Sequence, residues 1–173
     1  MSGEEGAFLR AIFEDPDDDG LRLIYADWLE EQGDPRGELV RLQCLLLNLG
    51  LTDPRRPELE ERARLLAAEH GNPLIRLPQR SRLLEKGRKR RVIRLSGPVQ
   101  GTIEYSRRRG RDVIRVNGEV VCDQFHKAPG WIEWVPVPGP LGLVRAGVTV
   151  FCGIIRLQYF LISLDSGIAY EEK

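Results

Sequence analysis

The sequence predicts an α+β fold, in which a small N-terminal helical bundle is followed by an antiparallel β-sandwich or open barrel. Up to Gly71, apolar residues recur three and four positions apart, as on one face of an amphipathic helix. From Val92 onward they alternate with polar residues, which is the period of a strand. We therefore predict a helical module over 1–75, a basic linker over 76–94 and an antiparallel β domain over 95–173.

Four helices with short connections are expected in the first part. Gly33 and Gly71 are typical of the position just beyond a helix C-terminus. Asp34 and Pro35 are typical of an N-cap and of the first helical residue. Short amphipathic helices joined by short loops form compact bundles. The helices are expected over residues 5–14, 21–32, 35–49 and either 53–70 or 57–70.

The second part contains short runs of strand-forming residues separated by turn signals. Asn117-Gly118 is the strongest short signal for a hairpin and joins two of these runs. The linker before them is expected to hold one short helix near residues 82–86. The strands are expected over residues 102–105, 113–116, 119–122, 131–137, 144–152, 155–164 and 168–170, with a turn at 165–167.

The charge of the chain is balanced in total and uneven along its length. The formal net charge is zero, yet residues 1–38 hold twelve acidic side chains against three arginines. Residues 76–94 hold nine basic side chains and one acidic one. Such asymmetry is typical of an interaction surface, or of two halves that attract each other.

Three features bear on the compartment in which the protein works. The cysteines are odd in number and widely spaced, at positions 44, 122 and 152, which favours buried, reduced thiols over a disulfide framework. The first residues lack a basic and apolar leader, and the most apolar stretch is too broken to span a bilayer. We therefore expect a cytoplasmic protein that does not enter a membrane.

The run Asp15-x-Asp17-x-Asp19-Gly20 matches the first half of a calcium-binding EF-hand loop, where acidic oxygens at alternate positions surround the ion. Ala26 occupies the position of the bidentate glutamate, so the loop lacks two of the required oxygens. We expect the aspartates to cap the second helix instead, where their charge stabilises its N-terminal end. Calcium binding stays open as the alternative, and no cofactor is predicted.

Several other residues suggest either chemistry or packing. Tyr25 and Trp28 suit a recognition surface, but their spacing among apolar residues favours the core. Asp27 interrupts the same helix, and we expect it to pair with Arg22 or Arg41.

Cys122 and His126 suggest a zinc site or a reactive thiol, but further ligands at useful spacing are missing. A packed Cys122 and a surface His126 are expected instead. The sequence also offers no nucleophile elbow, metal-ligand pair or carboxylate pair, so we predict no catalytic residue and no enzyme.

A series of short motifs runs through the helical module in a fixed order. They are Phe8-Leu9-x-Ala11-Ile12, Asp15-Pro16-Asp17-Asp18-Asp19, Arg22-Leu23-Ile24-Tyr25-Ala26-Asp27-Trp28-Leu29-Glu30-Glu31, Gly33-Asp34-Pro35-Arg36-Gly37-Glu38 and Arg41-Leu42-Gln43. Together they resemble the bacterial repeat-companion domain of planctomycetes and myxobacteria, over about residues 4–78. The resemblance implies a companion segment without an established activity. The motif residues that it marks, expected to be structural, are Asp15, Asp17, Asp19, Arg22, Tyr25, Asp27, Trp28, Asp34, Arg36 and Gln43.

A second resemblance concerns the β domain. The segments Ile103-Glu104-Tyr105 and Gly110-Arg111-Asp112-Val113-Ile114-Arg115-Val116-Asn117-Gly118-Glu119-Val120 resemble the opening hairpin of the Fas apoptotic inhibitory molecule family. This resemblance implies a non-enzymatic binding sandwich over about residues 99–170.

The basic residues between Arg76 and Arg111 are the most suggestive surface feature of the sequence. Clustered guanidinium groups neutralise phosphates and release counterions, which generates affinity for nucleic acid. Aromatic residues do not alternate with them, so base stacking is poorly supported. We therefore predict an adaptor that binds another protein, with nucleic-acid binding as the alternative. The residues expected to form the binding surface are Arg82, Lys86, Arg88, Lys89, Arg90, Arg91, Arg107, Arg108, Arg109 and Arg111.

Overall fold

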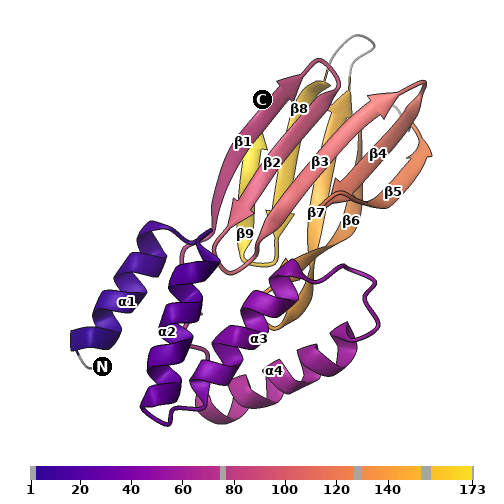
Figure 1. The fold of residues 1–173 in the computed structure, drawn as a ribbon. Coiled ribbons are helices and arrows are strands. Elements are labelled where there is room, and N and C mark those ends of the chain that lie inside the picture. Colours follow the sequence, from indigo (N-terminus) through magenta and orange to yellow (C-terminus); the bar gives the residue numbers. More distant parts are fainter. Residues whose placement is uncertain (1–2, 75–76, 127–129, 153–156, 173) are drawn as a thin grey trace. The chain divides into compact units, whose positions relative to one another are not determined.

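The computed structural model describes residues 3–74, 77–126, 130–152 and 157–172, apart from the side chains of residues 152, 158 and 159. The chain divides into two compact units (Figure 1). The helical unit comprises Met1–Pro78 and Pro138–Gly142, and the β unit comprises Gln79–Val137 and Leu143–Lys173. Helices followed by antiparallel sheets confirm the predicted α+β class.

The helical unit contains the four expected helices among its described residues. They are α1 (Gly3–Glu14), α2 (Asp19–Glu31), α3 (Arg36–Asn48) and α4 (Arg56–His70). Gly33 and Gly71 follow α2 and α4 with φ angles of 68° and 79°, a conformation that glycine adopts without strain. The helix-stop predictions at these two glycines are therefore confirmed.

The N-terminal end of α3 differs from its prediction. Pro35, and not Asp34, occupies the N-cap position, and it makes no side-chain cap. Asp34 still serves the helix end, because its Oδ1 accepts a hydrogen bond of 2.9 Å from the backbone N–H of Arg36. The carboxylate therefore satisfies one of the backbone donors that a helix start leaves unpaired.

Two apolar clusters form the core of the helical unit. In the first, Tyr25 is fully buried, and the rings of Phe8, Tyr25 and Trp28 contact one another. The centroid distances are 5.8 Å for Phe8–Tyr25, 5.5 Å for Phe8–Trp28 and 6.2 Å for Tyr25–Trp28. The prediction that Tyr25 and Trp28 belong to the core is confirmed. The second cluster consists of Leu39, Leu46, Leu49, Ala63 and Leu66, and Leu141 of the segment Pro138–Gly142 packs against it.

The β unit holds two antiparallel sheets, drawn as two layers in Figure 1. One sheet has the order β1-β2-β3-β4-β5 and the other β6-β7-β8-β9. The strands are β1 (Arg80–Gly87), β2 (Arg90–Ser96), β3 (Gly101–Arg108), β4 (Arg111–Val116), β5 (Glu119–Phe125), β6 (Gly130–Gly139), β7 (Gly142–Cys152), β8 (Leu157–Leu164) and β9 (Gly167–Glu172). The rings of Tyr105 on β3 and Phe160 on β8 lie 5.9 Å apart and join the two layers.

The predicted basic linker over 76–94, with its short helix, is wrong over most of its length. Strand β1 occupies the place of that helix and pairs with β2 from Arg80↔Ser96 to Gly87↔Arg90. Every residue of β1 before Gly87 is exposed, so the strand has no alternating apolar residues. Because that alternation is the sequence signal of a strand, an exposed edge strand is hard to detect.

The hairpin signal is confirmed by the backbone. Asn117 and Gly118 have φ angles of 52° and 86°, the positive values that a type I′ turn requires at both central positions. The turn joins β4 to β5, and the side chain of Asn117 accepts a hydrogen bond of 2.8 Å from the backbone N–H of Thr102 on β3. The turn residues therefore form the β4–β5 hairpin and also bind the backbone of the neighbouring strand β3.

Candidate functional sites

Much of the predicted basic surface is neutralised within the β unit. Arg91 is buried, and its guanidinium donates to both carboxylate oxygens of Glu172 at 2.6 and 2.9 Å. Lys86 binds the same carboxylate at 2.5 Å. Arg90 pairs with Glu85 and Glu104, and Arg111 pairs with Asp123. A cation that already has an acidic partner contributes less to binding phosphate.

The remaining basic residues of the cluster lie mainly on two turns. Arg88 and Lys89 connect β1 to β2, whereas Arg109 lies in the turn from β3 to β4 and has a positive φ of 50°. The backbone N–H of Arg107 donates to the carbonyl of Lys89 at 2.9 Å, so the two turns are neighbours at one end of the β unit. Arg82 lies on the exposed strand β1, and Arg108 is the last residue of β3.

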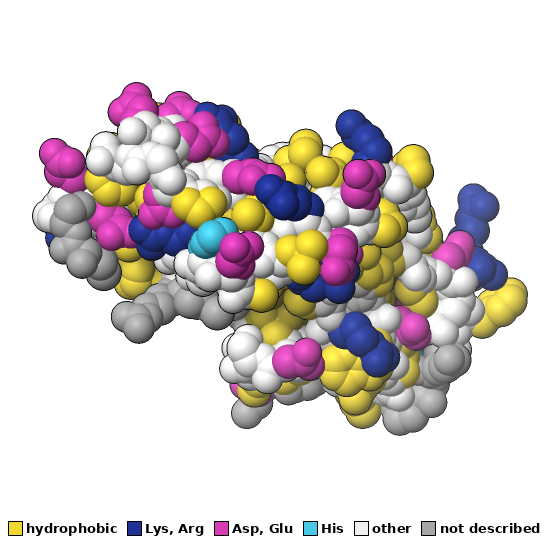
Figure 2. All heavy atoms as spheres, turned by 90° about the horizontal axis from the view of Figure 1, so that it is seen from below, with side chains coloured by type: hydrophobic (Ala, Val, Ile, Leu, Met, Phe, Trp, Pro, Cys, Tyr) yellow, Lys and Arg dark blue, Asp and Glu magenta, His cyan; other side chains and the backbone are white. Residues whose placement is uncertain are grey.

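Charge is mixed over other parts of the surface. On the face drawn in Figure 2, basic side chains lie next to acidic ones and do not form a patch of their own. Arg76, the first basic residue of the predicted cluster, lies outside the described residues. The structure therefore brings together only a subset of the predicted basic surface.

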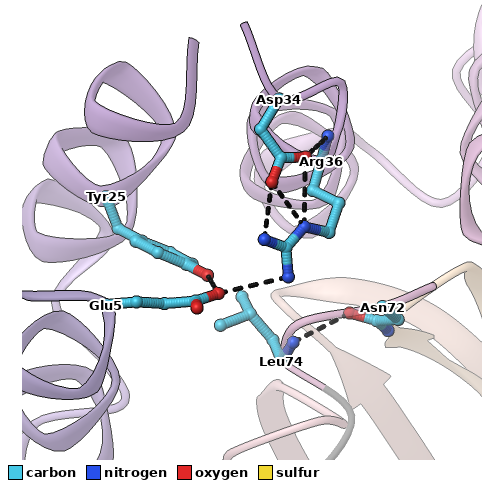
Figure 3. Close-up of polar contacts among 6 residues, drawn as sticks. All are labelled: Glu5, Tyr25, Asp34, Arg36, Asn72 and Leu74. Carbon is cyan, nitrogen blue, oxygen red and sulfur yellow. Dashed lines mark hydrogen bonds and ion pairs between the residues drawn. The ribbon is translucent and has the colours of Figure 1, made fainter. Parts of the chain in front are cut away.

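Three of the motif residues of the helical unit meet in one polar network (Figure 3). Arg36 binds Asp34 through hydrogen bonds of 2.8 and 2.5 Å and reaches Glu5 of α1 at 3.1 Å. Tyr25 donates its hydroxyl proton to the same Glu5 at 3.2 Å. Burial and the neighbouring Glu5 raise the pKa of the Tyr25 phenol, so the hydroxyl stays protonated and can donate. The network links α1, α2 and the start of α3, which is a structural role.

Other motif residues are also explained by structure. Asp27 and Arg41 form an ion pair, as predicted, but both side chains are exposed, so no buried charge is involved. Arg22 is buried and donates to the carbonyl of Pro16 at 2.9 Å. Burial lowers the pKa of its guanidinium, and the negative charges of Asp19 and Asp17 act in the opposite direction.

Gln43 is the motif residue that lacks a structural explanation. Its side chain is 2% exposed, yet neither its Oε1 nor its Nε2 has a hydrogen-bond partner among the described residues. A buried amide without partners destabilises a folded protein. The structure shows nothing that compensates for this cost.

The N-terminal end of α2 is capped by an aspartate that lies between the predicted ones, Asp15, Asp17 and Asp19. Asp18 is the N-cap, and its Oδ1 accepts hydrogen bonds from the backbone of Gly20 and Leu21 at 2.8 and 3.3 Å. Asp19 lies in the first helical turn and accepts a hydrogen bond of 2.8 Å from Asn48. Within the described part of the chain, no three His, Cys, Asp or Glu side chains are arranged to hold a metal ion.

The thiol of Cys44 offers little reactivity. Cys44 is buried, and burial raises the pKa of its thiol to about 11, which leaves the reactive thiolate scarce. Cys122 is partly exposed and lies opposite Ile114 in the β4–β5 pair. The predicted thiol of Cys152 lies outside the described side chains.

The outer face of the β6–β9 sheet is unusually apolar. Ile132 and Trp134 on β6 and Phe151 on β7 are exposed by 57%, 48% and 40%. Leu143 on β7 and Ile168 on β9 are exposed as well. These five residues are referred to below as the apolar face. A solvent-exposed side of a sheet normally carries polar residues, so several large apolar side chains on one face are typical of an interaction site.

Two aromatic rings of the apolar face rest on glycines of the neighbouring strand. A Cβ atom placed on Gly147 would lie 3.2 Å from the ring of Trp134, and one on Gly130 would lie 2.7 Å from the ring of Phe151. Arg145 stacks on Trp134 with its guanidinium carbon 5.3 Å from the ring centroid. The absence of a side chain at these glycines therefore lets both rings pack closely against the neighbouring strand.

A buried polar cluster at the end of the β unit was missed by the sequence analysis. Asp112 is completely buried; its Oδ1 accepts from the Tyr105 hydroxyl at 2.8 Å, and its Oδ2 lies 2.8 Å from Nδ1 of His126. The prediction of a surface His126 is wrong, since its side chain is only 11% exposed. A hydrogen bond between Nδ1 and this carboxylate requires a proton on one of the two atoms.

A sequence signal for this cluster was present. Asp112 precedes Ile114 and Val116 at two-residue steps, and both of these are fully buried in β4. An acidic residue at a strand position whose side chain points into the core indicates a buried charge that needs partners. Only the pairing of β4 with β5 shows that His126, fourteen positions later, is one of them.

Comparisons with known proteins give no further guide. No protein-family model, no curated protein and no solved structure matches this chain. The resemblances to the repeat-companion domain and to the Fas apoptotic inhibitory molecule family therefore stay predictions. None of the described helices combines the length and the hydropathy that a membrane crossing requires.

Proposed function

We propose that this chain is a non-catalytic adaptor that binds another protein through the apolar face of its β6–β9 sheet. The observation that carries the proposal is the pair of exposed rings, Trp134 and Phe151, which pack closely against Gly147 and Gly130. Rigid aromatic side chains lose little conformational entropy on binding, and tryptophan and arginine are enriched where binding energy concentrates.

The chemistry of the face indicates the kind of partner. Arg145 stacks on Trp134 near the middle of β7 and forms no ion pair with the described residues. A partner that places apolar side chains over the two rings and a carboxylate beside Arg145 would match both features. We therefore propose a partner with an apolar segment flanked by acidic residues.

The test compares affinity capture by the intact chain with capture by two variants. Trp134→Ser combined with Phe151→Ser removes the two rings, and Leu65→Ser removes an exposed apolar side chain on α4 as a matched control. The proposal expects a protein that is retained by the wild type and by Leu65→Ser after nuclease treatment. Reconstituted with the purified chain, that protein should bind at least about tenfold more weakly to the double variant.

Three results would contradict the proposal. The first is equal binding of the same partner by the double variant. The second is a wild-type dimer in sedimentation that the double variant turns into a monomer, because the face would then bind a second copy. The third is a hydrolase or transferase activity of the purified chain.

Nucleic-acid binding is the second candidate, supported by the hydrogen bond from Arg107 to Lys89 that brings two basic turns together. Its test is the binding of a fluorescent oligonucleotide as a function of salt concentration. Replacing Arg88, Lys89, Arg108 and Arg109 by alanine should reduce the salt slope if the turns bind phosphates. No binding at low salt, or a slope that the replacements leave unchanged, would eliminate this candidate.

A further inference from the structure

The polar cluster around Asp112 contains more hydrogen-bond donors than it uses. Nη1 of Arg107, Nε2 of Gln124 and Nε1 of Trp131 are buried atoms without a hydrogen-bond partner among the described residues. All three are N–H groups. Buried donors are almost always satisfied in folded proteins, so three in one region require an explanation.

The three residues that carry these donors lie near the side chains of Asp112 and Tyr105. Arg107 and Gln124 are the direct cross-strand partners of Asp112, one on β3 and the other on β5. Directly paired residues on neighbouring strands project to the same face of a sheet. Trp131 comes from β6 of the other sheet, and its ring lies 6.4 Å from the ring of Tyr105, whose hydroxyl binds Asp112.

Asp112 does not satisfy these donors, because none of them forms a hydrogen bond with its carboxylate. One oxygen accepts from Tyr105 and the other faces His126. The three residues with unused donors are each partly exposed, although the donor atoms themselves are buried. A small molecule can therefore reach the donors only if the partly exposed side chains that carry them move aside.

The charge of this region favours an anion. Arg107 is permanently cationic, and its backbone joins the turn that holds Arg88 and Lys89. Asp123, on the strand that carries Gln124, is already paired with Arg111 at 2.7 Å. An oxygen-bearing anion accepts hydrogen bonds from guanidinium, amide and indole N–H groups alike.

We propose that Arg107, Gln124 and Trp131 form a binding site for an oxyanion, that is, a carboxylate or phosphate group, beside the Asp112–His126 pair. Arg107 supplies the charge-assisted hydrogen bond, and Gln124 and Trp131 supply neutral ones. This site is separate from the apolar face, so it does not depend on the proposed adaptor function.

The experiment is an NMR titration of the three tryptophan indole N–H signals in the full chain. Inorganic phosphate, acetate and a short single-stranded oligonucleotide are the probes, and Trp131→Phe assigns the signal of Trp131. Phosphate or acetate should shift that signal saturably, while Trp28 and Trp134 serve as internal references. A response to the oligonucleotide alone would place the phosphate in a nucleic-acid backbone and overturn the small-ligand site.

Two variants and one matched control complete the test. Arg107→Met and Gln124→Leu should each weaken binding, Arg107→Met by about tenfold or more, because a charge-assisted hydrogen bond is lost. Arg108→Met removes the same charge one residue later, on the opposite side of β3, and should leave binding unchanged. Circular dichroism checks that each variant is folded. If Arg107→Met does not fold, Gln124→Leu still tests the site.

The outcomes that overturn the site are equally specific. An absence of any saturable shift would mean that water alone satisfies the three donors. Parallel, unsaturating shifts of all three indole signals would indicate a bulk salt effect. Equal weakening by Arg108→Met and Arg107→Met would indicate diffuse electrostatic attraction without a built site.

Discussion

Arg91 on β2 and Glu172 on β9 form a buried ion pair that joins the two sheets of the β unit. The guanidinium donates to both carboxylate oxygens at 2.6 and 2.9 Å, and the two side chains are only 5% and 13% exposed. Lys86 binds the same carboxylate, and Arg91 also donates to the carbonyl of Gly87. The sequence separates the two partners by 81 positions, so only the tertiary fold brings them together.

Glu172→Gln should destabilise the protein. The substitution keeps the shape of the side chain but leaves the buried charge of Arg91 without a counter-charge, a loss of about 2–4 kcal/mol. Urea unfolding measures the change in the free energy of unfolding. Glu85→Gln is the control, because Glu85 pairs with Arg90 where both side chains are well exposed, and it should cost less than about 0.5 kcal/mol. Equal losses for both variants would contradict a special role of the buried pair.

The same pair should make stability depend on pH in the acid range. Burial alone would raise the pKa of Glu172, but hydrogen bonds from Arg91 and Lys86 outweigh it and lower the pKa to about 2, from an ordinary value of 4.5. Because the folded state holds the proton less tightly, the contribution is full above about pH 5 and is lost as the pH falls toward 2.

Unfolding free energies at neutral pH and near the lower end of this range test the prediction. The decline of the wild type should exceed that of Glu172→Gln by up to about 3 kcal/mol. Other carboxylates with lowered pKa values, among them Asp34 and Glu38, contribute equally to both proteins and cancel in the difference. Identical pH profiles would show that the carboxylate of Glu172 does not titrate differently on folding.

Gln43→Leu should stabilise the helical unit. Both polar atoms of this buried amide are unpartnered among the described residues, and leucine of similar size removes their desolvation cost. We expect a gain of about 1 kcal/mol in thermal or urea unfolding. Gln32→Leu, at an exposed position after α2, is the control and should change stability little. A loss of stability in Gln43→Leu would show that the amide has a partner in solution.

Two helical glycines should respond oppositely to alanine. A Cβ on Gly37 would lie 2.7 Å from Cγ of Glu30 and 2.8 Å from the backbone oxygen of Ala26, so α2 and α3 would have to separate. Gly37→Ala should cost about 1–3 kcal/mol. A Cβ on Gly6 would meet only Arg10, at 3.5 Å, so Gly6→Ala should stabilise α1 by about 0.5–1 kcal/mol. Thermal unfolding measures the stability change of each variant. A stabilising Gly37→Ala would contradict the close approach of α2 and α3.

The sequence predicted the elements whose local signals are strong. The glycines at 33 and 71 end α2 and α4, and Asn117-Gly118 forms the turn from β4 to β5. These predictions hold because positive φ angles depend on the residue itself and on its immediate neighbours. Strand β1 was missed because its side chains face solvent and it pairs with the rest of the sheet through the backbone of β2.

The positions of the basic residues could not be predicted from the sequence alone. Arg90 and Arg91 are adjacent in sequence, but the alternation of a strand sends them to opposite faces, with Arg91 buried and Arg90 39% exposed. Arg107 and Arg108 separate in the same way, one toward the cluster of Asp112 and the other toward solvent. A run of charges therefore predicts one binding surface only if the run is not part of a strand.

The sequence by itself determined the α+β class, the helix ends and the hairpin, since these depend on residue periodicity and on the conformational preferences of single residues. Tertiary structure alone decided which polar residues meet. The pairing of β4 with β5 brings His126 to Asp112, and the packing of the two sheets brings Glu172 to Arg91. A buried charge is stable only beside partners of opposite charge or hydrogen-bonding ability, and strand pairing selects those partners from distant parts of the chain.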